Sequence, residues 1–286
     1  MKRLLSIFIL SIVVMCAITA RGGRQTVKHE GIVVSIDPIA GLVKQIVGDD
    51  FEVTTLLPLG ASPETYSPTM QQVAKAESAD LVFCLGTLPF ENELIGKTCK
   101  EDRIVNLSTN VELIAGSCHH HHDHHHHSAD PHIWFSVDEL VQIVDNIECA
   151  LAVKHPDSTK YSINCQQLKE RIASLKESYK QMLTTAPRSF LIYHPALGYL
   201  AKSLSLNQIA LENEGKSPTP SSLAAISDLV KREGVEVMFY QKEYPLEVIK
   251  PIADILGVKL VEINPLSEDI IEEIDRVINI IAGQNE

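Results

Sequence analysis

Short runs of aliphatic and β-branched residues alternate along this chain with longer segments in which apolar residues recur every three or four positions. The short runs predict strands, and the longer segments predict amphipathic helices. In a first block, we expect strands at residues 32–36, 52–57, 81–84 and 103–106. In a second block, we expect strands at residues 189–193, 208–211, 235–240 and 259–263. Both blocks alternate strand with helix, which is typical of parallel α/β sheets.

Helix boundaries can be read from capping residues. Ser136 followed by Glu139 predicts a capping box at the start of a helix over residues 137–153. Thr219, Pro220 and Gly234 delimit a helix in the second block, because Pro suits a first turn and Gly a C-terminal cap. Further helices are expected at residues 39–47, 70–76, 246–256 and 268–281.

One long helix is predicted between the two blocks. Over residues 159–185, apolar side chains recur at spacings of three and four, and charged residues occupy the other face. We therefore predict an α/β fold of two lobes with mainly parallel sheets, joined by one long central helix. The N-terminal lobe covers residues 31–156, the linking helix 159–185 and the C-terminal lobe 187–286.

The first twenty residues have the pattern of a signal peptide. Lys2 and Arg3 precede an apolar or hydroxyl-bearing run over residues 4–15, which is too short to span a bilayer. Cleavage after Ala20 and lipidation of Cys16 are the two alternatives for processing. Either predicts an exported protein, in the periplasm or on the outer face of the cytoplasmic membrane.

Charge and cysteine content exclude several classes of protein. The formal net charge of −12 argues against nucleic-acid binding, which requires a basic surface. The six cysteines include no C-x-x-C pair and do not form a disulfide framework. We expect Cys84 and Cys149 to be small buried thiols.

Candidate metal ligands lie in segments placed beyond the predicted strands. Ligands of open parallel sheets bind at the carboxyl ends of the strands, where residues 60–69, 130–134, 193–199 and 264–267 are expected. These segments contain Glu64, His132 and His194, and Asp130 is placed to support the ring of His132. Alone, Glu64 is more typical of a solvent-exposed loop, His132 is as typical of a packed loop residue, and His194 is typical of a hydrogen-bonded core histidine. Together, one carboxylate and two imidazoles suit Zn²⁺, and also Mn²⁺ or Fe²⁺.

The same segments resemble the metal-specific solute-binding proteins of bacterial ABC importers, in particular the zinc-uptake (ZnuA-like) group. The family pattern of Gly-x-x-Pro-His-x-Tyr-x-Pro, Asp-Pro-His-x-Trp and His-x-Ala-x-Gly-Tyr is matched in order at residues 60–68, 130–134 and 194–199. Residues 211–220 resemble its C-terminal-lobe loop, and the similarity covers essentially the whole mature chain. The resemblance implies a receptor whose long helix limits hinge motion, so that small loop shifts release the metal.

Two positions depart from the family pattern. Glu64 stands where the family usually has its first His, and Asn264 stands where many relatives have an Asp before Pro-Leu. We infer that the anionic ligand has moved from the C-terminal to the N-terminal lobe, with Glu64, His132 and His194 binding the ion. Asn264 or water is expected in the fourth position, and Gln241 and Glu243 are weaker candidates for it.

A histidine-rich segment precedes the Asp-Pro-His motif and holds eight of the twelve histidines. It consists of His119, His120, His121, His122, Asp123, His124, His125, His126 and His127. Unprotonated imidazoles in a flexible tract bind ions without one fixed geometry. We therefore expect an accessory loop, over residues 118–127, that collects zinc or senses its abundance.

These observations predict a monomeric extracytoplasmic receptor that binds a divalent metal, most simply zinc, and delivers it to the permease and ATPase subunits of an ABC importer. A manganese or iron receptor of the same type is the nearest alternative. A zinc-dependent hydrolase is another, but the sequence has no His-Glu-x-x-His, no nucleophile elbow and no phosphate-binding Gly loop, so we expect no enzymatic activity. A metal-buffering adhesin is the third alternative.

Deleting residues 118–127 tests whether the histidine-rich segment is accessory. The shortened protein should retain one tightly bound zinc ion per molecule and lose only weakly bound ions, because the tight ligands lie elsewhere in the chain. Elemental analysis with competitive metal titration measures both. Loss of the tight site on deletion would contradict the division between site and loop.

Overall fold

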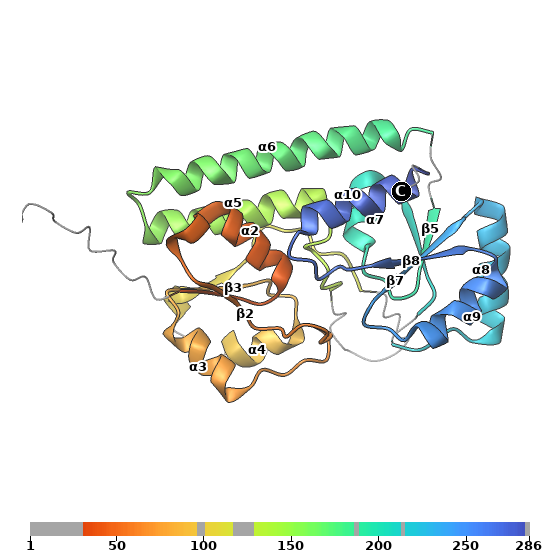
Figure 1. The fold of residues 1–286 in the computed structure, drawn as a ribbon, viewed down its shortest axis with the longest axis horizontal. Coiled ribbons are helices and arrows are strands. Elements are labelled where there is room, and N and C mark those ends of the chain that lie inside the picture. Colours follow the sequence, from red (N-terminus) through yellow and green to blue (C-terminus); the bar gives the residue numbers. More distant parts are fainter. Residues whose placement is uncertain (1–30, 96–100, 117–128, 186–188, 213–214, 284–286) are drawn as a thin grey trace, which may run out of the picture.

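The computed structural model describes residues 31–95, 101–116, 129–185, 189–212 and 215–283, which form two α/β lobes side by side (Figure 1). The predicted signal peptide, including Cys16, and the histidine-rich segment lie outside these residues. In the described part of the chain, no helix is both long and apolar enough to cross a membrane.

The N-terminal lobe is built on a four-stranded parallel sheet in the order β2-β1-β3-β4. Its central strands consist of buried aliphatic and aromatic residues, as expected of a sheet covered on both faces. The strands are β1 (Ile32–Val34), β2 (Val53–Thr55), β3 (Leu81–Cys84) and β4 (Ile104–Asn106). The helices are α2 (Asp37–Val47), α3 (Met70–Ser78) and α4 (Pro89–Ile95), with short 3₁₀ turns η1 (Gly48–Asp50) and η2 (Glu101–Arg103).

The C-terminal lobe repeats this topology in a second parallel sheet, in the order β6-β5-β7-β8. In each sheet the first strand lies between the second and the third, so the chain passes first to one side of it and then to the other. Open α/β sheets bind ligands beyond the carboxyl ends of the strands at such a switch point. The strands are β5 (Ser189–Ile192), β6 (Asn207–Ala210), β7 (Val237–Gln241) and β8 (Lys259–Ile263). The helices are α7 (Gly198–Leu204), α8 (Pro220–Glu233), α9 (Leu246–Leu256) and α10 (Ile270–Ile281).

Two long helices, α5 (Val137–Lys154) and α6 (Thr159–Met182), connect the lobes, and α6 runs across both of them (Figure 1). Near its start, the Asn164 side chain donates to the carbonyl of Ile46 in the N-terminal lobe, at 2.7 Å. Near its end, the Tyr179 hydroxyl donates to Asp275 of α10, at 3.0 Å. The predicted fold class, including the linking helix, is therefore confirmed.

The lobes share one hydrophobic core. Its buried residues include strand residues of both sheets, such as Val34 and Phe239, together with residues of α5, α6 and α10. A second, smaller core lies under α8 and α9 in the C-terminal lobe. Trp134, which is fully buried, donates its indole N–H to the carbonyl of Pro265 across the lobe boundary, at 2.7 Å. Relative motion of the lobes would open this shared core, so the packing opposes a wide hinge.

Several local predictions are wrong. Ser136 precedes α5 but makes no capping bond to its backbone, because the hydroxyl binds the Glu139 carboxylate instead. A complete capping box forms at α3, between Thr69 and Gln72. Cys149 is exposed on α5, whereas Cys84 is buried as expected.

The predicted element ends also differ from the structure. The linking helix ends at Met182 rather than at residue 185, and most strands are shorter than their apolar runs. The short helices α4 and α7 were not predicted, because seven residues are too few to show a helical period.

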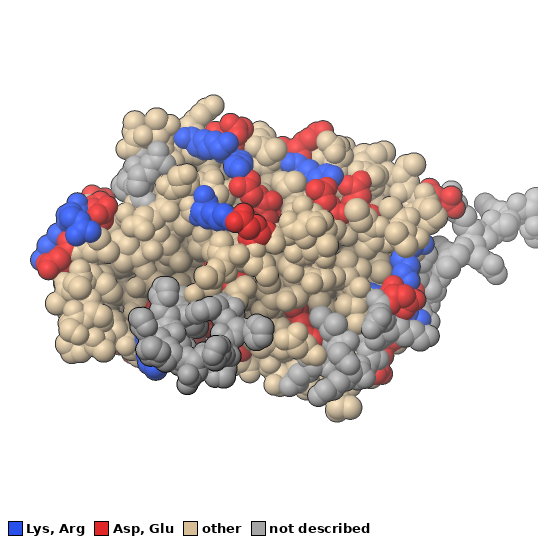
Figure 2. Space-filling model, turned by 180° about the vertical axis from the view of Figure 1, so that it is seen from behind, with Lys and Arg blue, Asp and Glu red and all other residues tan. Residues whose placement is uncertain are grey.

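The surface agrees with the low basic content of the chain. On the face seen in Figure 2, acidic and basic side chains are interspersed, and the described part of that face carries no broad basic patch.

Gly41 lies where the two lobes pack closely together. A Cβ atom at Gly41 in α2 would lie 1.9 Å from the carbonyl oxygen of Glu268, just before α10. Helix propensity alone predicts that Gly41→Ala stabilises the protein by about 1 kcal/mol. We expect instead a loss of about 1–3 kcal/mol in the free energy of unfolding, because the overlap forces backbone to move. Chemical denaturation measures the sign.

Lys44→Ala is the matched control for this substitution. Lys44 forms an exposed ion pair with Glu268 at 2.7 Å, and its loss should change stability by less than about 1 kcal/mol. A stabilised Gly41→Ala variant would contradict close packing at this boundary.

Candidate metal centre

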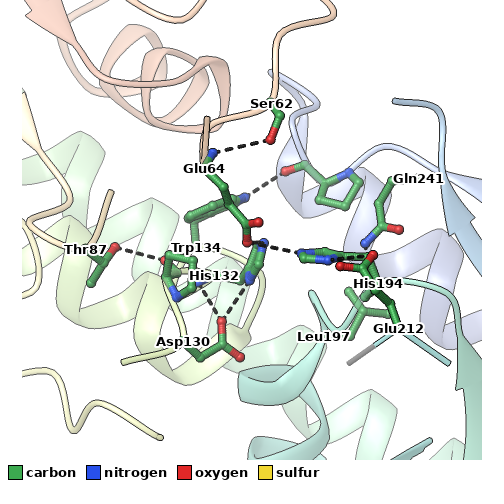
Figure 3. Close-up of polar contacts among 12 residues, drawn as sticks. Ser62, Glu64, Thr87, Asp130, His132, Trp134, His194, Leu197, Glu212 and Gln241 are labelled. Atoms are coloured by element: carbon green, nitrogen blue, oxygen red, sulfur yellow. Dashed lines mark hydrogen bonds and ion pairs between the residues drawn. The ribbon is translucent and has the colours of Figure 1, made fainter. Parts of the chain in front are cut away.

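Three segments that are far apart in sequence meet at the boundary between the lobes (Figure 3). Glu64 lies in the turn after β2, His132 in the segment before α5, and His194 directly after β5. One ligand atom of each lies within 4.8 Å of the others, and among the described residues no further His, Cys, Asp or Glu joins this cluster. The structure thus brings together the carboxylate and both imidazoles that the sequence suggested.

The turn that carries Glu64 is fixed by local hydrogen bonds. The backbone N–H of Tyr66 donates to the Ser62 carbonyl at 3.1 Å, and the N–H of Glu64 donates to the Ser62 hydroxyl at 3.3 Å. Tyr66 then packs edge-on against Phe90 of α4, with 5.5 Å between ring centroids. These contacts anchor the turn while the Glu64 side chain remains 37% exposed.

His132 is held by the residue two positions earlier. Its backbone N–H and its ring Nδ1 both contact Asp130 Oδ1, at 2.9 and 2.8 Å. The ring therefore presents Nε2 to the cluster. The hydroxyl of Thr87 donates to the Pro131 carbonyl at 2.9 Å, which ties this segment to the loop after β3.

His194 is held by residues of the C-terminal lobe. Its Nδ1 lies 3.3 Å from Oε2 of Glu212, and its backbone carbonyl accepts a hydrogen bond from Gln241 Nε2 at 2.9 Å. The ring of Tyr244 stacks on the imidazole, with 5.5 Å between centroids and 24° between planes. Both histidines are thus buried with Nδ1 facing a carboxylate and Nε2 facing Glu64.

The distances among these atoms suit a tetrahedral ion. Oε1 of Glu64 lies 3.2 Å from His194 Nε2 and 3.9 Å from His132 Nε2. Ligand atoms that bind zinc at about 2.0–2.1 Å in a tetrahedron lie about 3.3 Å apart. The distance from Glu64 to His194 is already close to this value, and the distance from Glu64 to His132 exceeds it by about 0.6 Å.

The charges of Glu64 and His194 are coupled. The hydrogen bond to His194 lowers the pKa of Glu64, against the opposing effect of burial. Burial alone would lower the pKa of His194, but the Glu212 and Glu64 carboxylates outweigh it and raise that pKa to about 9. In the metal-free protein, His194 therefore carries a proton at neutral pH, and its positive charge lies between the Glu64 and Glu212 carboxylates.

A cavity of about 350 Å³ opens beside the three residues. Gln241 and Glu243, two candidates for the fourth position, line this cavity, and each has a buried oxygen without a hydrogen-bond partner. Asn264 lines a neighbouring cavity of about 170 Å³, and its backbone N–H donates to Glu273 at 2.7 Å. Its side-chain oxygen is also buried without a hydrogen-bond partner, and Glu243 and Leu266 line both cavities, so Asn264 stays a candidate for the fourth position.

Glu212 and Tyr244 were missed by the sequence analysis. Glu212 follows β6 closely, so it lies at the carboxyl end of the strand that neighbours β5. The rule that singled out His194 would have found Glu212 as well. Tyr244 gives no such signal, because its stacking on His194 depends on the turn after β7.

Two parallel α/β lobes joined by a long helix, with the candidate ligands where the lobes meet, are the architecture of a solute-binding receptor. The profile of the ZnuA family, described as zinc-uptake complex component A, periplasmic, matches residues 32–280. The chain therefore belongs to this family.

Individual relatives agree with the family assignment. The zinc-binding lipoprotein AdcA of Streptococcus pneumoniae R6 is 27% identical over 304 residues, covering 100% of this chain and 58% of AdcA. The high-affinity zinc uptake system protein ZnuA of Bacillus subtilis 168 is 29% identical, covering 86% of this chain and 81% of that protein. A crystal structure of ZnuA superposes with a TM-score of 0.79 at 26% identity, covering 90% of this chain and 100% of the other. The chain spans about half the length of the streptococcal AdcA proteins that it matches.

Metal binding at His194 should release a proton. Because the pKa of His194 in the metal-free protein is about 9, a metal that binds Nε2 at pH 7.5 must displace about one proton. Apparent affinity should therefore rise about tenfold per pH unit from pH 6.5 towards pH 9 and then level off. Zinc calorimetry at pH 7.5 in buffers of different ionisation enthalpy measures the released proton.

The raised pKa of His194 also makes the stability of the metal-free protein depend on pH. The stabilisation from the charged His194 is fully present below pH 6.5 and is lost as the pH rises through about 9. Zinc binding without proton release at pH 7.5 would contradict a charged His194 in the metal-free state.

Proposed function

We propose that this protein is an extracytoplasmic receptor that binds zinc tightly and delivers it to the permease and ATPase subunits of an ABC importer. The observation that carries the proposal is the meeting of Glu64, His132 and His194, from both lobes, in a member of a zinc-uptake family. Proteins of this family are binding components of transporters, and enzymatic activity is not part of their role.

In the proposed site, zinc is bound by one carboxylate oxygen of Glu64 and by Nε2 of His132 and His194. The anionic ligand comes from the N-terminal lobe, and it gives the site a formal ligand charge near −1. The fourth position faces the cavity, where we assign it to a water molecule held by Gln241 and Glu243. Their unpartnered buried oxygens can accept both hydrogens of such a water.

The ligand set favours zinc over manganese and iron. Two imidazoles with one carboxylate are typical zinc ligands, whereas Mn²⁺ prefers sites rich in oxygen. The lobe boundary also favours capture over catalysis, because the three residues are held by packed loops and the ion would be largely enclosed. Zinc binding without hydrolysis of ester, peptide or phosphate substrates would separate a receptor from a zinc hydrolase.

Export and the accessory loop complete the proposal. The pneumococcal relative is described as a lipoprotein, which supports a lipid anchor at Cys16 in place of cleavage after Ala20. We propose that residues 118–127 gather zinc near the tight site. Their neighbours Gly116 and Ala129 line a third cavity, which Glu64, His132 and His194 also line.

Replacing Glu64 by Gln tests the proposed site. The amide keeps the shape of the side chain but removes the anionic ligand, so zinc affinity should fall by roughly 100-fold or more, beyond the usual effect of an outer-shell change. Competition with a chromophoric chelator measures the affinity. Glu236→Gln, on an exposed residue before β7, removes the same charge away from the site and should leave affinity unchanged.

A second variant separates charge from ligand type. Glu64→His restores the family pattern and should retain tight zinc binding through a third imidazole. If Glu64→Gln bound zinc as tightly as the parent protein, the assignment of Glu64 as a ligand would be wrong.

A further inference from the structure

Glu212 is a buried carboxylate that the proposed ligand set does not use. Its side chain is 7% exposed, and its backbone N–H donates to the Tyr193 carbonyl at 2.8 Å, directly before His194. We propose that Glu212 is a positioning residue for the metal: it accepts the Nδ1 proton of His194 and so directs Nε2 at the ion. This inference rests on the proposed zinc site and adds a residue that controls its affinity.

The geometry around the imidazole supports this role. Nδ1 of His194 lies 3.3 Å from Glu212 Oε2, and Nε2, on the far side of the ring, lies 3.2 Å from Glu64 Oε1 (Figure 3). A neutral imidazole has one N–H and one lone pair. A proton shared with Glu212 therefore leaves the lone pair on the nitrogen that faces Glu64.

The N-terminal lobe has the same arrangement in a tighter form. Asp130 contacts Nδ1 of His132 at 2.8 Å and aligns as a hydrogen bond, whereas the Glu212 contact is longer and is not yet aligned. Hydrogen bonds at binding sites often tighten only in the loaded complex. We expect zinc at Nε2 to draw the His194 ring and Glu212 into the alignment that Asp130 and His132 already have.

The C-terminal lobe holds Glu212 in place for this role. Tyr244 stacks on the His194 ring, and burial together with the nearby Glu212 and Glu64 carboxylates raises the pKa of its hydroxyl. Gln241 fixes the backbone carbonyl of His194 at 2.9 Å. A buried carboxylate is costly unless it is paired, and the charged ring of His194, 3.3 Å away, is a partner for it.

Glu212→Gln is the test, because the isosteric amide can still accept a hydrogen bond but carries no charge. Outer-shell partners of metal-bound histidines typically contribute 10–100-fold in affinity, so zinc should bind about 10–100-fold more weakly. Glu212→Leu removes the acceptor as well and should weaken binding further. Glu236→Gln is again the matched control.

A spectroscopic signature distinguishes positioning from general packing. In zinc-loaded protein with ¹⁵N-labelled histidine, long-range ¹H–¹⁵N spectra report the protonated and metal-bound nitrogens of His194. The parent should show the proton on Nδ1, and Glu212→Gln should shift that Nδ1 signal while leaving the ring of His132 unchanged.

The outcomes separate this inference from the proposed function. If the parent binds zinc tightly and Glu64→Gln does not, but Glu212→Gln matches the parent in affinity and in the His194 spectrum, the positioning role is overturned and the receptor stands. Weaker binding with an unchanged His194 signal would also overturn it. If the parent itself fails to bind zinc tightly, the proposed function fails.

Discussion

The packing between the two lobes is the constraint on which the rest of the structure depends. The candidate ligands come from both lobes, so their distances hold only if the lobes keep their relative position. The buried indole of Trp134, bound to the Pro265 carbonyl at 2.7 Å, crosses the boundary two residues from His132. The Tyr199 hydroxyl crosses it as well, donating to the Asp130 carbonyl at 3.0 Å and accepting from the N–H of Ile114. The segment that carries His132 is thus also one that holds the lobes together.

This arrangement determines how an ion can enter and leave. Because the core is continuous and α6 packs on both lobes, wide separation of the lobes would expose much apolar surface. Exchange therefore depends on the loops. Glu64 lies on the most exposed of them, whereas His132 and His194 are buried. In the proposed site, a small displacement of the turn around Glu64 would remove the anionic ligand and leave two imidazoles. A proton on His194 lies between the Glu64 and Glu212 carboxylates and offsets the repulsion between them.

Much of the fold was predictable from the sequence. The eight strands, the linking helix and the capped helix from Pro220 to Glu233 follow from local patterns, because apolar period, Pro at a first turn and Gly at a C-terminal cap act within a few residues. The capping box at Ser136 was not realised, because the Glu139 carboxylate binds the serine hydroxyl that would otherwise cap the helix. Cys149 is exposed on α5, whereas Ile147 and Leu151 on either side of it are buried.

For the metal centre, the sequence by itself determined the kinds of side chain and their positions beyond the strands: a carboxylate after β2, an imidazole before α5 and another after β5. Only the tertiary structure decided which groups share the cavity, since that depends on how two separate sheets are turned towards one another. It placed Glu212 and Tyr244 against the ring of His194. Sequence patterns report the period and ends of single elements. Distances between loops of different lobes are set by the shared core, and no local pattern encodes them.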